Sequence, residues 1–109
     1  MMKLLIIIVQ DDDVAEVMNS LTREKIGATK LASSGGFLKR GNTTIIVGVE
    51  EEQVDLVRDI IREKCRSRIE MMPSIPVIAQ GIITASEPLE VRVGGAIFFQ
   101  LDIEEFHKF

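Results

Sequence analysis

The segment Ala28–Thr44, ATKLASSGGFLKRGNTT, gathers residue types that could together hold a nucleotide. Its Ser-Ser-Gly-Gly run, which ends at Gly36, can place several backbone N–H groups on one concave side, a common way to bind phosphate oxygens. Phe37 offers a ring on which a base can stack, worth about 1–3 kcal/mol. The Lys-Arg pair that follows can add charge-assisted contacts, and Asn42 can hydrogen-bond a base edge. A Gly-Gly pair is not a nucleotide fingerprint, so the pattern alone favours a solvated connection whose Phe packs on the core.

The remaining reactive side chains do not assemble a catalytic or metal site. His107 has no cysteine or carboxylate cluster at metal spacing beside it, so we interpret it as a solvated terminal histidine. Asp11–Asp13 could bind a divalent cation, but three acids at a helix start are more often caps. Cys65 is interpreted as structural, and no serine or threonine has an evident histidine partner. We therefore expect a protein that is not an enzyme and has neither metal nor cofactor.

Length and composition indicate one globular domain that spans residues 1–109. Hydrophobic residues make up 46% and charged residues 28% of the chain, which favours neither a disordered nor a membrane class. The longest apolar run, Leu4–Val9, is far shorter than the roughly 20 residues that cross a bilayer, and no signal peptide is expected. The net charge of −4 argues against binding to nucleic acid polymers. A single cysteine fits a reducing compartment, so we predict a cytoplasmic protein without membrane insertion.

Hydrophobic periodicity predicts the order β-α-β, β-α-β, which is the split arrangement of a ferredoxin-like α+β fold. Extended segments are predicted at 3–10, 27–33, 43–49 and 89–93, with a resumption at 96–101. Helices are predicted to start at the acidic runs Asp11–Asp13 and Glu50–Glu52. Their inward stripes are Val14, Val17, Met18 and Leu21 in the first helix, and Val54, Val57, Ile60 and Ile61 in the second.

Two connections and the chain end complete this prediction. A short loop is expected at about 33–42. A long loop is expected at about 67–88, where prolines and a glycine exclude a helix; connections this long are usually functional, mobile or locally structured. Asp102 and Glu105 have capping-box spacing ahead of an apolar tail.

The first predicted strand suggests an oligomer. In a ferredoxin-like fold both helices cover one sheet face, so a strand open to solvent on the other face should alternate polar and apolar residues. Leu4–Val9 does not alternate. Both faces of this strand therefore need covering, which a second subunit could do. The alternative is that the long loop or the C-terminal tail folds over the open face.

Four motifs resemble the PII-like cyclic di-AMP receptor proteins. They are IIIVQDDD at 6–13, ATKLASSGGFLKRGNTT at 28–44, VGGA at 93–96 and EFHKF at 105–109. The similarity covers nearly the whole chain and is weakest at 67–88. It implies a homotrimer of ferredoxin-like subunits, related in fold to the PII nitrogen regulators. It also implies that cyclic di-AMP binds in clefts between subunits, without catalysis.

The resemblance assigns roles to individual residues. Thr29 would contact the ligand near its phosphates, and Asn42 would hydrogen-bond an adenine. Phe37 and Leu38 would pack against a base, and Phe99 would close the pocket from the neighbouring subunit. The full set of implied ligand-binding positions is Lys25, Gly27, Thr29, Gly36, Phe37, Leu38, Asn42, Gly48, Phe99 and Lys108, with Gly48 allowing close approach of the ligand to the backbone.

Three positions depart from a characterised form of the motif. That form has Asn where Lys25 stands, Arg where Gly27 stands and Gln where Lys108 stands. An arginine near a phosphate is worth the roughly 1.5–3 kcal/mol of a hydrogen bond to a charged group, and lysine replaces its charge but not its bidentate geometry. The departures leave the affinity and the identity of the ligand open.

The leading hypothesis is a receptor whose loops engage or release a protein partner of unknown identity when ligand binds. A PII-type regulator that binds ATP and 2-oxoglutarate is the second, although the chain has no tyrosine for the modification known in many PII proteins. A trimeric adaptor that binds no nucleotide is the third. A small hydrolytic enzyme comes last, because its catalytic residues are missing.

Overall fold

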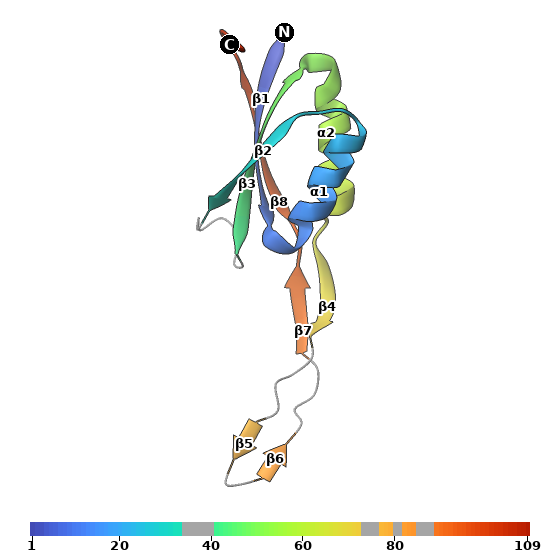
Figure 1. Cartoon of the computed structure of the whole chain (residues 1–109). Helices are drawn as coiled ribbons and strands as arrows, with labels where there is room; N and C mark the ends of the chain where they lie inside the picture. Colours follow the sequence, from blue (N-terminus) through green and yellow to red (C-terminus); the bar gives the residue numbers. More distant parts are fainter. Residues whose placement is uncertain (34–40, 73–76, 80–81, 85–88) are drawn as a thin grey trace.

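The computed structural model describes residues 1–33, 41–72, 77–79, 82–84 and 89–109 (Figure 1). The helices are α1 (Asp11–Arg23) and α2 (Val54–Lys64), and a 3₁₀ turn, η1 (Glu51–Gln53), precedes α2. The strands are β1 (Met2–Gln10), β2 (Ala28–Ser33), β3 (Asn42–Glu50), β4 (Arg68–Met72), β5 (Val77–Ala79), β6 (Ile82–Thr84), β7 (Leu89–Val93) and β8 (Ala96–Asp102). In the part of the chain that is described, no helix is both long and apolar enough to cross a membrane.

The core is a four-stranded antiparallel sheet in the order β2-β3-β1-β8, with α1 and α2 on one face (Figure 1). Alternate residues of the two inner strands point toward the helices and are completely buried. They are Leu5, Ile7 and Val9 of β1 and Ile45 and Val47 of β3. The predicted α+β class is confirmed, and the strand order is compatible with a ferredoxin-like arrangement.

The helices bury the predicted stripes, and α1 begins at Asp11 as predicted, but its three aspartates do not have the capping role expected of them. Val14, Val17 and Leu21 of α1 are buried, and Met18 packs at the edge of the core. Gln10 is the N-cap residue of α1, so the three aspartates lie in the first turn and do not cap it. Acids suit this position because they face the positive end of the helix dipole. Asp11 and Asp13 bond other parts of the chain, since Asp11 accepts from Thr43 and Asp13 accepts from Arg68.

The second helix, α2, starts later than predicted. Glu50 continues the sheet, because it pairs with Met2, and Glu51–Gln53 form the 3₁₀ turn before α2 begins at Val54. Glu50 and Gln53 make a reciprocal capping box at this turn, which satisfies backbone N–H groups that the helix start would leave unbonded.

The opposite face of the sheet carries apolar side chains that no described element covers. This open face includes Ile6 of β1, Ile46 of β3 and Phe99 and Leu101 of β8, with Phe99 and Leu101 exposed by 42% and 46%. The side chains on the other face of β8 do contact a helix. Arg58 of α2 lies 5.6 Å from the centroid of the Phe98 ring and donates to Gln100. The described chain leaves a mostly apolar sheet face uncovered, as the non-alternating run in β1 predicted.

A narrow arm extends from the bottom of this core (Figure 1). It includes part of the segment 67–88, where an irregular loop was expected. Strands β4 and β7 pair antiparallel from Arg68↔Val93 to Met72↔Leu89, and β5 pairs with β6 beyond them. The molecule is therefore long, with extents of 64 × 23 × 20 Å. The prolines that exclude a helix at 67–88 do not exclude strands on either side of them, because an edge strand tolerates a neighbouring proline. The described arm extends beyond the sheet and does not cover its open face.

The chain end is not helical. Asp102 lies in β8, where Lys3 Nζ of the adjacent strand donates to its carboxylate, and residues 103–109 form neither helix nor strand. Asp102 is therefore used by the sheet and does not act as a helix cap. A single helical turn at a chain end would also have to offset the unfavourable cost of helix nucleation.

Gly94 and Gly95 join the arm to the sheet. Both have a left-handed backbone, with φ of 85° and 89°. Gly94 N–H donates to Gln10 Oε1 at 2.7 Å, and Gly95 N–H donates to the carbonyl of Cys65 at the end of α2. A Cβ on Gly94 would lie 2.3 Å from the backbone oxygen of Arg66, whereas a Cβ on Gly95 would meet nothing within 4 Å.

Cys65 follows α2 beside this junction, and its environment makes the thiol unreactive. Its side chain is 2% exposed, and burial raises the pKa of the thiol to about 12, with a further contribution from Asp13. At neutral pH the thiol is therefore protonated. A protonated buried thiol is a poor nucleophile, in agreement with the structural role inferred from its position.

The two glycines provide a matched test of this junction. Because both residues are left-handed, alanine at either site should cost roughly 1–2 kcal/mol of strain. Only Gly94→Ala also forces Cβ against a backbone carbonyl, so it should lower the free energy of unfolding by clearly more than Gly95→Ala. Urea denaturation followed by circular dichroism measures both. Equal losses would contradict the described packing at the base of the arm.

Candidate functional site

Three of the predicted site residues meet where β2 and β3 lie side by side. Thr29 pairs with Ile46, and Gly27 and Gly48 each lie one residue beyond the last pair of these strands, Ala28↔Val47. Thr29, Gly27 and Gly48 are all exposed. This group, which we call the β2–β3 site, lies at the β2 edge of the sheet next to the open face.

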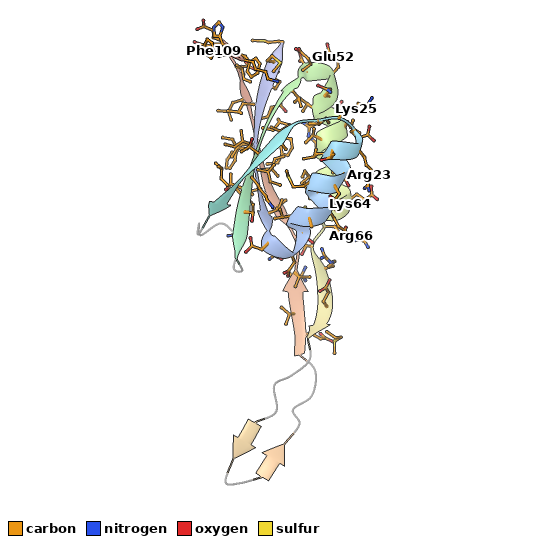
Figure 2. The ribbon with its side chains drawn as sticks, in the orientation of Figure 1. Arg23, Lys25, Glu52, Lys64, Arg66 and Phe109 are labelled. Atoms are coloured by element: carbon orange, nitrogen blue, oxygen red, sulfur yellow. The ribbon has the colours of Figure 1, made fainter. Side chains whose placement is uncertain are left out.

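The turn before β2 sets the positions of Lys25 and Gly27. Helix α1 ends at Arg23, and Lys25 then takes a left-handed backbone with φ of 59°, where its N–H donates to the carbonyl of Thr22 at 3.0 Å. The left-handed position after the helix, which glycine usually fills, belongs to Lys25. Lys25 is exposed at the turn (Figure 2). A Cβ at Gly27 would meet nothing within 4 Å, so a larger side chain would fit there.

Asn42 lies at the other end of β3. It pairs with Gln10 of β1 and Ser33 of β2 and is 3% exposed. Four residues separate it from Ile46, which is roughly 13 Å along a strand. Asn42 is therefore close to the connection between β2 and β3, and distant from Gly48. The predicted positions Gly36, Phe37 and Leu38 lie in this connection, outside the described residues, as does most of the expected short loop.

Phe99 lies on the same open face as Thr29 but at the opposite edge of the sheet. Ile6 pairs with Ile46 on one side and with Phe99 on the other, so one row of residues runs from Thr29 to Phe99. Three strand spacings of about 4.8 Å separate the ends of this row by roughly 14 Å. A single chain thus does not bring Phe99 beside Thr29.

Lys108 belongs to the exposed tail after β8. In this tail the His107 ring stacks on Phe109 with centroids 5.9 Å apart, and His107 Nε2 lies 2.7 Å from Glu105 Oε1. Phe109 lies at the end of the core remote from the arm (Figure 2). The structure does not bring Lys108 together with Asn42, which is near the opposite end of the sheet.

Asp11 makes contacts with the start of β3 that were not predicted. Its N–H donates to the carbonyl of Gly41 at 2.9 Å, and its Oδ1 accepts from Thr43 Oγ1 at 2.6 Å. With Val14, Lys30 and Thr43 it lines a cavity of about 360 Å³ beside the start of β3. An aspartate directly after a buried strand was visible in the sequence, but its partner 32 residues away depended on the register of β1 and β3.

Two further cavities lie near the junction of α2 with the arm. One of about 390 Å³ is lined by charged side chains, among them Asp13, Lys64 and Arg68. The other, of about 490 Å³, has an apolar floor that includes Ile61, Cys65 and Phe98, with arginines at its rim. Among the described residues, no group of three or more His, Cys, Asp or Glu side chains is arranged to hold a metal ion.

Comparison with known proteins identifies relatives over the full length of the chain. A structure described as a functionally unknown protein from Pediococcus pentosaceus ATCC 25745 is 37% identical, with a TM-score of 0.80, over 99% of this chain and 97% of that one. A DUF3240 family protein from Shewanella baltica OS155 has a TM-score of 0.60 at 10% identity, over 99% of this chain and 96% of that one. At that identity the second likeness concerns the fold alone.

A family model described as cyclic-di-AMP receptor matches residues 2–109. The match spans all the described elements and the motifs on which the resemblance was based, so the resemblance is confirmed. This chain is a member of the cyclic-di-AMP receptor family.

Proposed function

We propose that this protein is a non-enzymatic receptor that binds cyclic di-AMP in clefts between the subunits of a homotrimer. Occupancy would control the conformation of its loops and thereby the binding of a protein partner in the cytoplasm. The observation that carries the proposal is the row from Thr29 to Phe99, which places two expected ligand-binding residues on one face at opposite sheet edges. Membership of the receptor family supports the choice of ligand.

The separation of Thr29 from Phe99 favours an intersubunit site. If the β2 edge of one subunit meets the β8 edge of the next, Thr29 of the first lies near Phe99 of the second. This contact joins two different surfaces, and such contacts generate closed rings when the rotation between subunits closes. The apolar open face gives the assembly a driving force, because burying it against other copies removes Ile46, Phe99 and Leu101 from water.

The residues of the site can divide the ligand between them. Exposed Thr29 and Gly48 suit the phosphate-bearing ring, because a hydroxyl can donate to phosphate oxygens and a residue without a side chain allows the ligand to approach the backbone closely. Asn42 carries the donor and acceptor that an adenine edge requires. Phe37 and Leu38 are proposed to cover a base, as the resemblance implies.

The arm is the proposed surface for the protein partner. Ile69 and Met71 are exposed on the same face of β4, by 56% and 59%. Exposed apolar groups on a projecting pair of strands are typical of a recognition surface.

Titration calorimetry with cyclic di-AMP tests the receptor assignment, with cyclic di-GMP and ATP as controls. We expect selective binding of about one ligand per subunit. Asn42→Ala should weaken binding by about 5- to 150-fold, the equivalent of the 1–3 kcal/mol of an amide–adenine pair. Asn19→Ala, at an exposed position on α1, is the matched control and should leave affinity unchanged. Absence of heat with all three nucleotides would refute the proposal and favour the adaptor.

A substitution at Gly27 tests the site through an expected gain of affinity. An arginine placed in the open space at this position could reach a phosphate of the ligand. Gly27→Arg should therefore tighten binding about 10- to 100-fold, from the roughly 1.5–3 kcal/mol of a charged hydrogen bond. Gly27→Ala controls for the change in backbone freedom. Equal affinities of the two variants would remove residue 27 from the proposed phosphate site.

The oligomer can be tested with two leucines of similar exposure on different faces. Leu101 is 46% exposed on the open face, and Leu56 is 38% exposed on α2. Leu101→Glu should break the trimer because it introduces a charge into the proposed interface, whereas Leu56→Glu should not. Sedimentation velocity measures the mass of each variant. A wild-type monomer, or a trimer that survives Leu101→Glu, would contradict the proposed assembly.

A further inference from the structure

The segment Gln10–Asp13, where β1 passes into α1, contacts two regions that are far apart in the sequence. On one side it holds Gly41 and Thr43, which follow the β2–β3 connection. On the other side it holds Gly94 and Arg68, which form the base of the arm. We call this segment the β1–α1 junction.

The contacts on the ligand side are tight. Asp11 uses both its N–H, toward the carbonyl of Gly41, and its Oδ1, toward Thr43. A Cβ on Gly41 would lie 2.6 Å from Asp11 Oδ2, so a side chain at this position would displace the Asp11 carboxylate. Asn42, the proposed adenine-binding residue, lies between these two anchored positions and pairs with Gln10 across the sheet.

The contacts on the arm side involve a buried charge. Asp13 Oδ1 accepts from Arg68 Nη2 at 3.0 Å, and the Asp13 side chain is 6% exposed. Its other oxygen, Oδ2, is buried and has no hydrogen-bond partner among the described residues. Because a buried carboxylate without a counter-ion is unfavourable, Asp13 depends strongly on Arg68 staying in place.

Arg68 in turn belongs to the first residue pair of the arm. Its Nε donates to Glu70 Oε1 and its Nη1 to the carbonyl of Arg66, both at 3.1 Å. The hydrogen bond to Asp13, and after it the one to Glu70, raise the pKa of the guanidinium. Gln10 Oε1 accepts from Gly94 N–H on the other strand of the arm. The junction therefore hydrogen-bonds to both sides of the arm where it leaves the core, to Arg68 on one side and to Gly94 on the other.

We propose that the β1–α1 junction couples the ligand site to the arm, with Asp11 and Asp13 as its two positioning residues. Asp11 and Asp13 lie in one helical turn, so a displacement of Asp11 by the Gly41–Thr43 segment moves Asp13 relative to Arg68. This inference rests on the proposed function for the identity of the ligand, but the mechanical link does not. Coupling between two sites is reciprocal, so each end should respond to a change at the other.

The first test needs no ligand. Thr43→Val removes the hydroxyl that donates to Asp11 and keeps the shape of the side chain, and Thr44→Val, one residue along β3, is the matched control. Amide hydrogen exchange followed by mass spectrometry measures opening of β4 and β7, with β1 as an internal reference for global unfolding. We expect Thr43→Val to raise exchange in β4 and β7 at least threefold, with β1 and the Thr44→Val variant unchanged. Unchanged exchange in the arm of Thr43→Val would overturn the proposal.

The second test runs in the opposite direction. Asp13→Asn/Arg68→Gln removes the ion pair without leaving a buried charge, so the variant is expected to fold. Its affinity for cyclic di-AMP, measured by calorimetry, should change at least threefold although neither residue belongs to the proposed ligand site. The control is Arg92→Gln, an arm arginine that bonds Ser67 and does not reach the junction.

The outcomes separate the two proposals. If the wild type binds ligand and the double variant binds it with the same affinity, the coupling is refuted and the receptor assignment stands. If the wild type binds no cyclic di-AMP, the receptor assignment fails, and the exchange experiment alone still decides whether the junction links the two regions.

Discussion

The architecture depends on the need to bury β1 on both of its faces. Its run of six apolar residues, Leu4–Val9, lies in the middle of the sheet, between β3 and β8. The odd-numbered residues meet the two helices and form the core, which accounts for the complete burial of Leu5, Ile7 and Val9. The even-numbered residues face the other way, toward the sheet face that no described element covers. The strand is thus suited to a subunit of an assembly, and the proposed trimer follows from it.

Features that depend on local periodicity could be predicted from the sequence. The helical stripes, the order of the core elements and the uncovered face all come from residues a few positions apart. The start of α1 at Asp11 was predicted correctly, but the capping role given to the three acids was wrong, because acids suit the first turn as well as the cap and the local pattern does not separate the two. Strand β7 was predicted at 89–93. Strand β4 was not predicted, because it is stabilised by pairing with β7 across about twenty residues.

In the candidate site, too, the local motif could be predicted from the sequence, whereas the contacts between distant residues could not. The motif around Asn42 was sufficient to identify the family, because a motif is a property of the sequence itself. The positions of Gly27 and Gly48 beyond the last β2–β3 pair, and the bond between Asp11 and Thr43, depend on strand register, which sequence reasoning did not supply. The separation of Thr29 from Phe99 is also a result of register. It explains why residues assigned to one ligand do not gather in one chain.

The closeness of the two ends of the arm has a consequence for how the family can vary. The chain leaves the core at Cys65 and returns at Gly95, and these two residues are joined by a hydrogen bond. Everything between them is, in topological terms, an insertion into a domain that closes without it. Lengthening or shortening such an insertion changes the entropy of loop closure only slowly. Evolution could therefore exchange the arm for another of different length and partner preference while the nucleotide-binding core stays the same. The same point would accept an engineered reporter domain.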